Sequence, residues 1–255
     1  MSTLNVFLRS LWLKYSQELK RPRSFFMGIF FAAAPLIFLT AVLKWGEVTD
    51  VEDFAVGYFL FLYGGMSVLF FSIVMGIGLY QREVDGGTVP YMLEVPLKRY
   101  QIHFSRYISA VMFQMTFVVP SLLISHLALL KWWGDKIGEG GGLPLLLIMT
   151  IGGIFAYTAI FTLLSLTIPK PLLVSFMYGL FWEYLVGIST LRMKSLTVMY
   201  YLKSLTIRSI MKGGTYIGGE KLAGAADSSY ALILASVVFL LLGAIVLSVK
   251  NFEKI

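Results

Sequence analysis

The sequence has little charge for its length, and this shortage argues against an ordinary soluble domain. Only 14% of its 255 residues are charged and 58% are hydrophobic, whereas soluble globular domains carry about 25% charged residues. A lipid bilayer is the second apolar solvent that accounts for such a composition. A membrane protein is therefore the starting hypothesis.

Cysteine is absent and histidine is nearly so, which limits the available chemistry. Without cysteine, no disulfide and no thiolate metal site can form. The two histidines, His103 and His126, have no ligand-like partner at helical spacing, and no Gly-x-Ser-x-Gly motif occurs. Hydrolysis within a membrane needs a nucleophile with a base, or a set of metal ligands. An intramembrane enzyme and a bound metal are therefore disfavoured.

Six windows are long and apolar enough to cross a bilayer as helices, which takes about 20 residues each. They are residues 24–43, 54–80, 107–130, 143–168, 171–190 and 229–249. Their hydrophobicity is continuous, whereas a β-barrel shows alternation over segments of about 10 residues. We predict an all-α integral membrane protein with six transmembrane helices in a single domain, residues 1–255.

Residues 4–20 follow a different pattern. Their apolar residues recur at i, i+3, i+4, i+7, i+8, i+11 and i+15, which is one face of a helix, and basic residues such as Arg9 and Lys14 lie off that face. A basic amphipathic helix with Trp12 on its apolar side is typical of the membrane interface. We therefore predict an interfacial helix, after which Pro22 turns the chain into the first span.

The net charge of +7 comes mostly from Lys and Arg at the ends of the apolar windows, which indicates membrane orientation rather than nucleic-acid binding. In the first two outer loops, the only Lys or Arg residues are Lys44, Lys131 and Lys136. This bias predicts a multi-pass protein of the cell membrane with both termini cytoplasmic. Six spans place the basic segment 191–228 outside. If residues 171–190 do not span, that segment is cytoplasmic instead.

The inner loop at residues 81–106 is the most informative part of the sequence. Gly86 and Gly87 break the preceding helix, Thr88 can cap a new short helix, and Pro90 is tolerated in its first turn. The apolar side of this helix and its end are given by Met92, Leu93 and Pro96. A short helix with one apolar face is suited to docking into a groove on a partner.

At this loop the chain resembles the type-2 ATP-binding-cassette (ABC) exporter permease family, which has a Glu-Arg-Glu, Gly-Thr, Leu-Leu, Pro and Arg pattern after its second span. The matching residues are Arg82, Glu83, Gly87, Thr88, Met92, Leu93, Pro96 and Arg99. The sequence departs from the pattern at Gln81, at Pro90 and in two extra residues between Glu83 and Gly87. The resemblance covers about 20 residues in motif and the whole chain in layout.

The resemblance implies that this loop forms a coupling helix against a separate cytoplasmic nucleotide-binding ATPase subunit, which would bind ATP and Mg²⁺. The chain itself has no Gly-x-x-x-x-Gly-Lys-Ser/Thr phosphate loop, so we expect no cofactor and no ATP hydrolysis on it. It also implies a second permease subunit, in a homodimer or a heterodimer. The wide apolar spans suit a lipid or an amphiphilic substrate better than a free ion.

Glu183 is the one formal charge well inside an apolar window. Intramembrane acids are costly and often functional, so a transport role and a structural role both stay open. The main alternative to an exporter permease is a self-sufficient secondary transporter or channel that uses Glu183. That class often has internal repeats, broken helices or several buried charges, and we find no convincing repeat.

Overall fold

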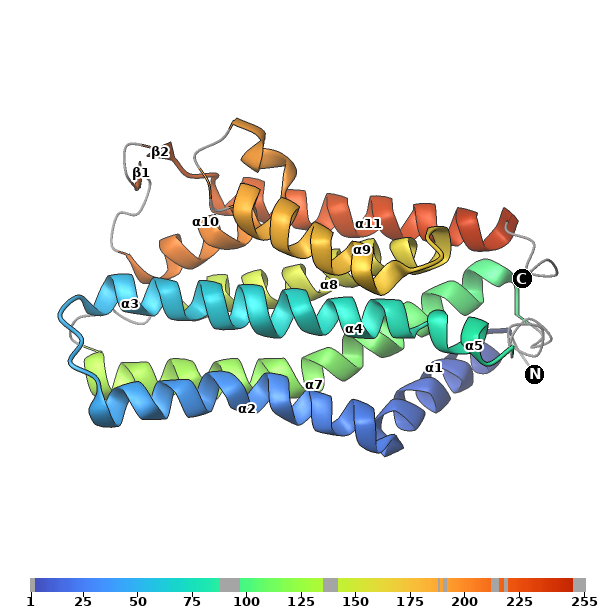
Figure 1. Cartoon of the computed structure of the whole chain (residues 1–255), viewed down its shortest axis with the longest axis horizontal. Coiled ribbons are helices and arrows are strands. Elements are labelled where there is room, and N and C mark those ends of the chain that lie inside the picture. The colour runs from blue at the N-terminus through green and yellow to red at the C-terminus, as the bar shows by residue number, and fades with distance from the viewer. Residues whose placement is uncertain are drawn as a thin grey trace.

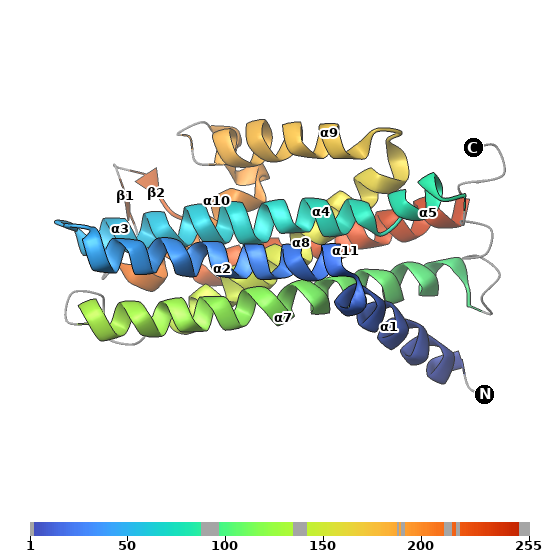
Figure 2. The same ribbon diagram turned by 60° about the horizontal axis from the view of Figure 1, so that its bottom comes forward.

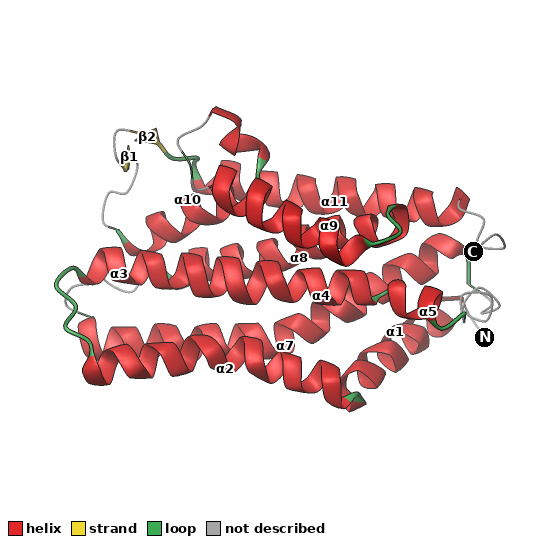
Figure 3. Cartoon of the chain, in the orientation of Figure 1, coloured by secondary structure: helices red, strands yellow, loops and turns green. Residues whose placement is uncertain are grey.

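The computed structural model describes residues 3–87, 97–134, 142–187, 189, 192–211, 216–217 and 220–249, and nearly all of them are helical (Figure 3). The first half of the chain forms α1 (Thr3–Lys20), α2 (Pro22–Trp45), α3 (Val51–Tyr58), the π-helical η1 (Phe59–Phe70), α4 (Phe71–Gly78), α5 (Gln81–Asp85) and α7 (Arg99–Trp133). The second half forms α8 (Leu143–Thr167), α9 (Pro171–Met177), the π-helical η2 (Tyr178–Val186), the 3-10 helix η3 (Arg192–Leu196), α10 (Val198–Ile210) and α11 (Ala225–Val249). Two short strands, β1 (Tyr216–Ile217) and β2 (Glu220–Lys221), pair antiparallel.

Among the described residues, five helices are long and apolar enough to cross a membrane. They are α2, the continuous run at residues 51–84, α7, α8 and α11. Four of the six predicted windows lie within them, and the window 143–168 extends one residue beyond its helix. The predicted count of six spans is not confirmed. The window 171–190 forms the shorter helical run α9–η2, which ends at Val186 after 16 residues.

The helices run side by side along one long axis (Figure 1). α1 begins, α5 lies and α11 ends at one end of the bundle, whereas β1, β2 and the connection between α2 and α3 lie at the other end. α1 diverges from the bundle at an angle (Figure 2). Between α8 and α11 the chain returns to the end of the bundle that contains β1 and β2. It does so in two pieces, first through α9 and η2 and then through α10.

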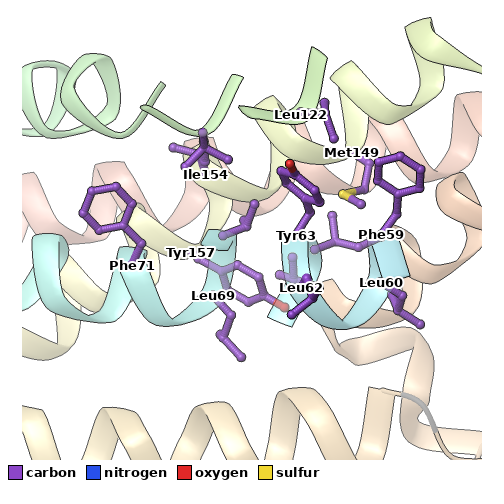
Figure 4. Packing of buried hydrophobic residues seen from close by; sticks show 14 of the residues in the cluster. Phe59, Leu60, Leu62, Tyr63, Leu69, Phe71, Leu122, Met149, Ile154 and Tyr157 are labelled. Atoms are coloured by element: carbon purple, nitrogen blue, oxygen red, sulfur yellow. The ribbon is translucent and has the colours of Figure 1, made fainter. Parts of the chain in front are cut away.

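The core surrounds α8, which packs against α4, α7, α10 and α11. Figure 4 shows buried side chains of this cluster, among them Phe71 of α4, Tyr63 of η1 and Tyr157 of α8. α4 and α8 approach closely at Gly76, where an added Cβ would lie 2.9 Å from Phe161 Cβ and 3.2 Å from Thr162 N. Small residues permit such close approach in membrane bundles.

Pro35 interrupts the hydrogen-bond ladder of α2. Because proline has no N–H, the carbonyl of Phe31, four residues earlier, has no partner in its own helix. Ser67 of η1 donates to this carbonyl at 2.7 Å, and Ser121 of α7 donates to the neighbouring Ala32 carbonyl at 2.6 Å. Serine side chains of adjacent helices thus bond to the α2 backbone where the proline interrupts it.

We expect Ser67→Ala to lower the free energy of unfolding by about 1–2 kcal/mol, because the buried Phe31 carbonyl is left without a donor. In a Pro35→Ala background the restored N–H pairs with that carbonyl, so the same substitution is expected to cost much less. Unfolding in detergent micelles measures all four variants. Equal losses in the two backgrounds would contradict the assignment of Ser67 as the partner of the Phe31 carbonyl. Thr40→Ala, which removes a hydroxyl bonded within α2, is the control.

Candidate functional site

The helix that contains the second predicted span breaks at Leu79 and Tyr80, between α4 and α5. Arg106 of α7 donates from Nη1 to the Leu79 carbonyl at 2.7 Å, and its guanidinium carbon lies 5.6 Å from the centre of the Tyr80 ring. Arg106 is buried. One buried cation therefore holds the α4–α5 break against α7.

Charged side chains of α1, α5 and α7 meet at this break and form the ion-pair cluster. Its members are Lys14, Glu18, Arg21, Arg82, Glu83 and Arg106. Glu83 Oε1 lies 2.9 Å from Lys14 Nζ and 3.0 Å from Arg106 Nη2, so one carboxylate joins α1 to α7. Arg82 Nη1 lies 3.0 Å from both carboxylate oxygens of Glu18, which joins α5 to α1.

Glu18 is the acid at the centre of the α1 side of this cluster. Burial raises its pKa, but hydrogen bonding from Ser24 and the positive charges of Arg82 and Arg21 outweigh burial and hold the pKa below 4.5. Burial and the positive charge of Arg106 lower the pKa of Lys14 below 10.5 against the opposing effect of Glu83. Desolvation of the partners makes such charge-assisted bonds stronger than exposed ion pairs.

α1 contacts the bundle through its polar side. Ser10 donates to Ser105 of α7 at 3.1 Å, and the Tyr15 hydroxyl lies 3.0 Å from the Thr116 hydroxyl. The large apolar side chains of Leu4, Leu8 and Trp12 are exposed. Leu4, Leu8 and Trp12 of the predicted apolar face thus point away from the protein, whereas Tyr15 and Leu19 of the same face pack against the core.

The structure brings together two of the predicted site residues, Arg82 and Glu83, both in the ion-pair cluster. Gly87 follows α5 with a φ of 63°, a left-handed conformation that favours glycine. Arg99 lies elsewhere and donates to the Ser248 carbonyl near the end of α11 at 3.3 Å. The remaining predicted residues, which lie outside the described residues, are Thr88, Met92, Leu93 and Pro96.

Four members of the cluster were not predicted as site residues from the sequence: Lys14, Glu18, Arg21 and Arg106. In the sequence, Lys14 is one of several basic residues off the apolar face of residues 4–20, and Arg106 is the last residue of the inner loop. Glu18 is an acid in an otherwise basic amphipathic helix, and this mismatch is the one signal that could have pointed to a partner elsewhere in the fold. The identity of that partner depends on tertiary packing, which spacing along the chain does not encode.

A second feature is an apolar groove of about 470 Å³ between α2, η1, α9 and η2, here called the aromatic groove. Its lining residues are Phe30, Phe31, Phe61, Gly65, Met66, Phe70, Phe176, Leu180 and Tyr184. Phe70 stacks on Phe176 with ring centres 5.3 Å apart, and Phe61 meets Tyr184 edge to face at 6.0 Å. Both π-helical segments border this groove, and π-helical turns occur frequently at functional sites.

Glu183 lies in η2, next to the groove residue Tyr184, and is fully buried. Its carboxylate accepts hydrogen bonds from the Tyr178 hydroxyl at 2.7 Å, the Tyr157 hydroxyl at 3.0 Å and the Met199 backbone N–H at 3.0 Å. Glu183 therefore belongs to a hydrogen-bonded site of its own, and it is not part of the ion-pair cluster.

Comparison with known proteins gives one family. The sequence model of the ABC-2 family transporter proteins matches residues 17–189, which is more than half of the chain. The match begins within α1 and includes the aromatic groove, Glu183 and every member of the ion-pair cluster except Lys14. No curated protein and no solved structure matches the chain.

We expect Glu18→Gln to lower the free energy of unfolding by about 1–3 kcal/mol at neutral pH, because charge-assisted hydrogen bonds are lost. The pKa of Glu18 is lower in the folded chain than its usual value of 4.5. Its stabilising effect is therefore present above that value and is lost as the pH falls through the folded-state pKa.

The difference between wild type and Glu18→Gln should accordingly shrink as the pH falls below 4.5, and unfolding in detergent across this range measures it. Glu47→Gln, which changes an exposed acid before α3, is the control. A difference that does not change with pH would show that the carboxylate charge is not what stabilises the cluster.

Proposed function

Because the chain belongs to the ABC-2 transporter family, we propose that it is the transmembrane permease subunit of an ATP-driven exporter. ATP hydrolysis takes place on a separate cytoplasmic subunit. The single observation that carries the coupling role is the ion-pair cluster, which joins the α4–α5 break to α1 and α7. Family membership supports membrane transport, and the cluster supports the route by which energy enters the chain.

The segment 81–106 contacts the ATPase and transmits its movement. Its first described part, α5, is bonded to α1 through Arg82 and Glu18 and to α7 through Glu83 and Arg106. A displacement of α5 therefore moves three helices together. Ion pairs suit this transmission because they fix the orientation of α5 relative to α1 and α7. Part of the free energy lost when they break is regained when they form again in the next conformational state.

The end of the bundle that contains α1, α5 and the end of α11 is cytoplasmic. The bias of Lys and Arg toward the segments at this end supports the orientation. α1 lies in the membrane interface with Leu4, Leu8 and Trp12 in lipid, since these side chains are exposed while its polar side bonds to the bundle. The chain crosses the membrane a sixth time through α9, η2 and α10 taken together.

The aromatic groove binds the apolar part of the substrate, and its lining favours a lipid or another amphiphile. Ring faces and edges pack well against acyl chains and ring systems, and the groove offers no described charge for a free ion. The groove is open on one side of the single chain, and a second permease subunit, identical or not, closes it. The pathway thus runs between two permease subunits.

We predict that the chain co-purifies with the ABC ATPase encoded beside its gene when the two are co-expressed. Replacement of residues 86–96 by a Gly/Ser linker is expected to abolish this association. Glu83→Gln should retain it but lower ATP-driven transport by about tenfold, because α5 loses its ion pairs to Lys14 of α1 and Arg106 of α7.

Transport is measured as ATP-dependent movement of a fluorescent NBD-labelled phosphatidylcholine across reconstituted vesicles, with Glu47→Gln as the matched control. If the folded chain binds no ATPase, it is not a coupled permease. If Glu83→Gln transports at the wild-type rate, the cluster does not transmit the movement.

We also predict that Leu180→Trp lowers the same lipid transport by about tenfold, since the larger ring fills the aromatic groove and hydrophobic pockets discriminate by this order. Leu173→Trp places the same side chain on the exposed surface of α9, outside the groove, and should transport normally. Equal transport by the two variants would exclude the groove as the binding site.

A further inference from the structure

Between α8 and α11, one helix, α10, begins inside the bundle. α9 and η2 together span residues 171–186, which at about 1.5 Å per residue is at most about 24 Å, less than the hydrocarbon thickness of about 30 Å. α10 continues toward the far end of the bundle (Figure 1). Its first residues, Val198 and Met199, are buried.

A helix that begins away from water has N–H groups in its first turn that need partners from elsewhere. In α10, Thr197 accepts from the Tyr200 N–H at 3.3 Å, as an N-cap residue does. The Met199 N–H donates to Glu183 Oε2 at 3.0 Å. One of these partners is local, and the other comes from 16 residues earlier in the chain.

The surroundings of Glu183 contain hydrogen-bond donors throughout. Tyr157 of α8 and Tyr178 of η2 direct their hydroxyls to its two oxygens, and Met199 presents a backbone N–H. An ionised carboxylate only accepts hydrogen bonds, so this arrangement suits the charged form. Among the described residues no Lys or Arg forms an ion pair with Glu183. The positive end of the α10 dipole supplies the compensating charge.

We infer that Glu183 is a positioning residue, the buried hydrogen-bond acceptor that holds the amino end of α10 against η2 and α8. Its neighbour Tyr184 and the nearby Leu180 line the aromatic groove. Glu183 thereby fixes the position of α10, the outer part of the proposed sixth crossing, relative to the aromatic groove. The consequence for transport rests on the proposed function, whereas the anchoring of α10 does not.

The test is amide hydrogen exchange of α10 in the full chain, in detergent, for Glu183→Ala and Glu183→Gln. Ala removes the acceptor, so exchange at the first-turn amides of α10 should rise by about tenfold, as expected for one lost hydrogen bond. Gln retains one acceptor oxygen and should restore most of the protection. Ser204→Ala, which removes a hydroxyl bonded within α10, should leave these amides unchanged.

Transport of the NBD-labelled lipid gives the second reading. The Glu183→Gln variant is expected to transport the lipid with the same pH dependence as the wild type, because Glu183 holds a helix in place and does not transfer a proton during transport. A Gln variant with protected α10 amides but no transport would overturn the inference and make Glu183 a transport acid. Unchanged exchange in Glu183→Ala would also overturn it.

If Glu183→Ala does not fold, Tyr157→Phe combined with Glu183→Gln tests the same contacts. This pair should expose the α10 amides more than Glu183→Gln alone does. Equal protection in the two would contradict the anchoring role. A failure of all lipid transport, with the exchange results as expected, would count against the proposed function and leave the anchor of α10 intact.

Discussion

Inside a bilayer a backbone N–H or C=O group finds no water, so every break in a helix needs a partner from the protein itself. Among the described residues, the backbone hydrogen-bond ladder is interrupted at Pro35, at Leu79 and at the start of α10, and a side chain from another element bonds to the backbone at each place. Ser67 bonds the carbonyl near Pro35, Arg106 bonds the Leu79 carbonyl, and Glu183 bonds the Met199 N–H. Ser67 and Glu183 are fully buried, so no water can replace these two partners.

Two of these three places also take part in the proposed ATP-driven transport. At the α4–α5 break, the cation that bonds the backbone also pairs with Glu83, and the cluster extends from there to Glu18 on α1. At the start of α10, the acceptor that bonds the backbone lies beside the aromatic groove. The side chain that bonds the backbone at each of these two places therefore also connects helices to one another.

Hydropathy and helical periodicity predicted much of this fold. The windows 24–43 and 229–249 fall within α2 and α11, and residues 4–20 form α1, because lipid requires long apolar helices whatever their neighbours. The loop pattern also singled out Arg82 and Glu83. Composition could not show that the helical run in the window 171–190 ends at Val186, or that Glu183 in this run bonds the Met199 N–H, because both depend on tertiary packing. The pairing of Glu18 with Arg82 likewise depends on tertiary packing.

The central claim is that the segment after α5 contacts a cytoplasmic ATPase. The natural chain has no cysteine, so a single introduced cysteine can carry a photo-crosslinker to one known position. Tyr100→Cys, at an exposed site in the first turn of α7, should crosslink to the co-expressed ATPase, while Glu47→Cys before α3 should not. Crosslinking from Glu47→Cys, or from neither position in an ATPase-containing preparation, would contradict the claim.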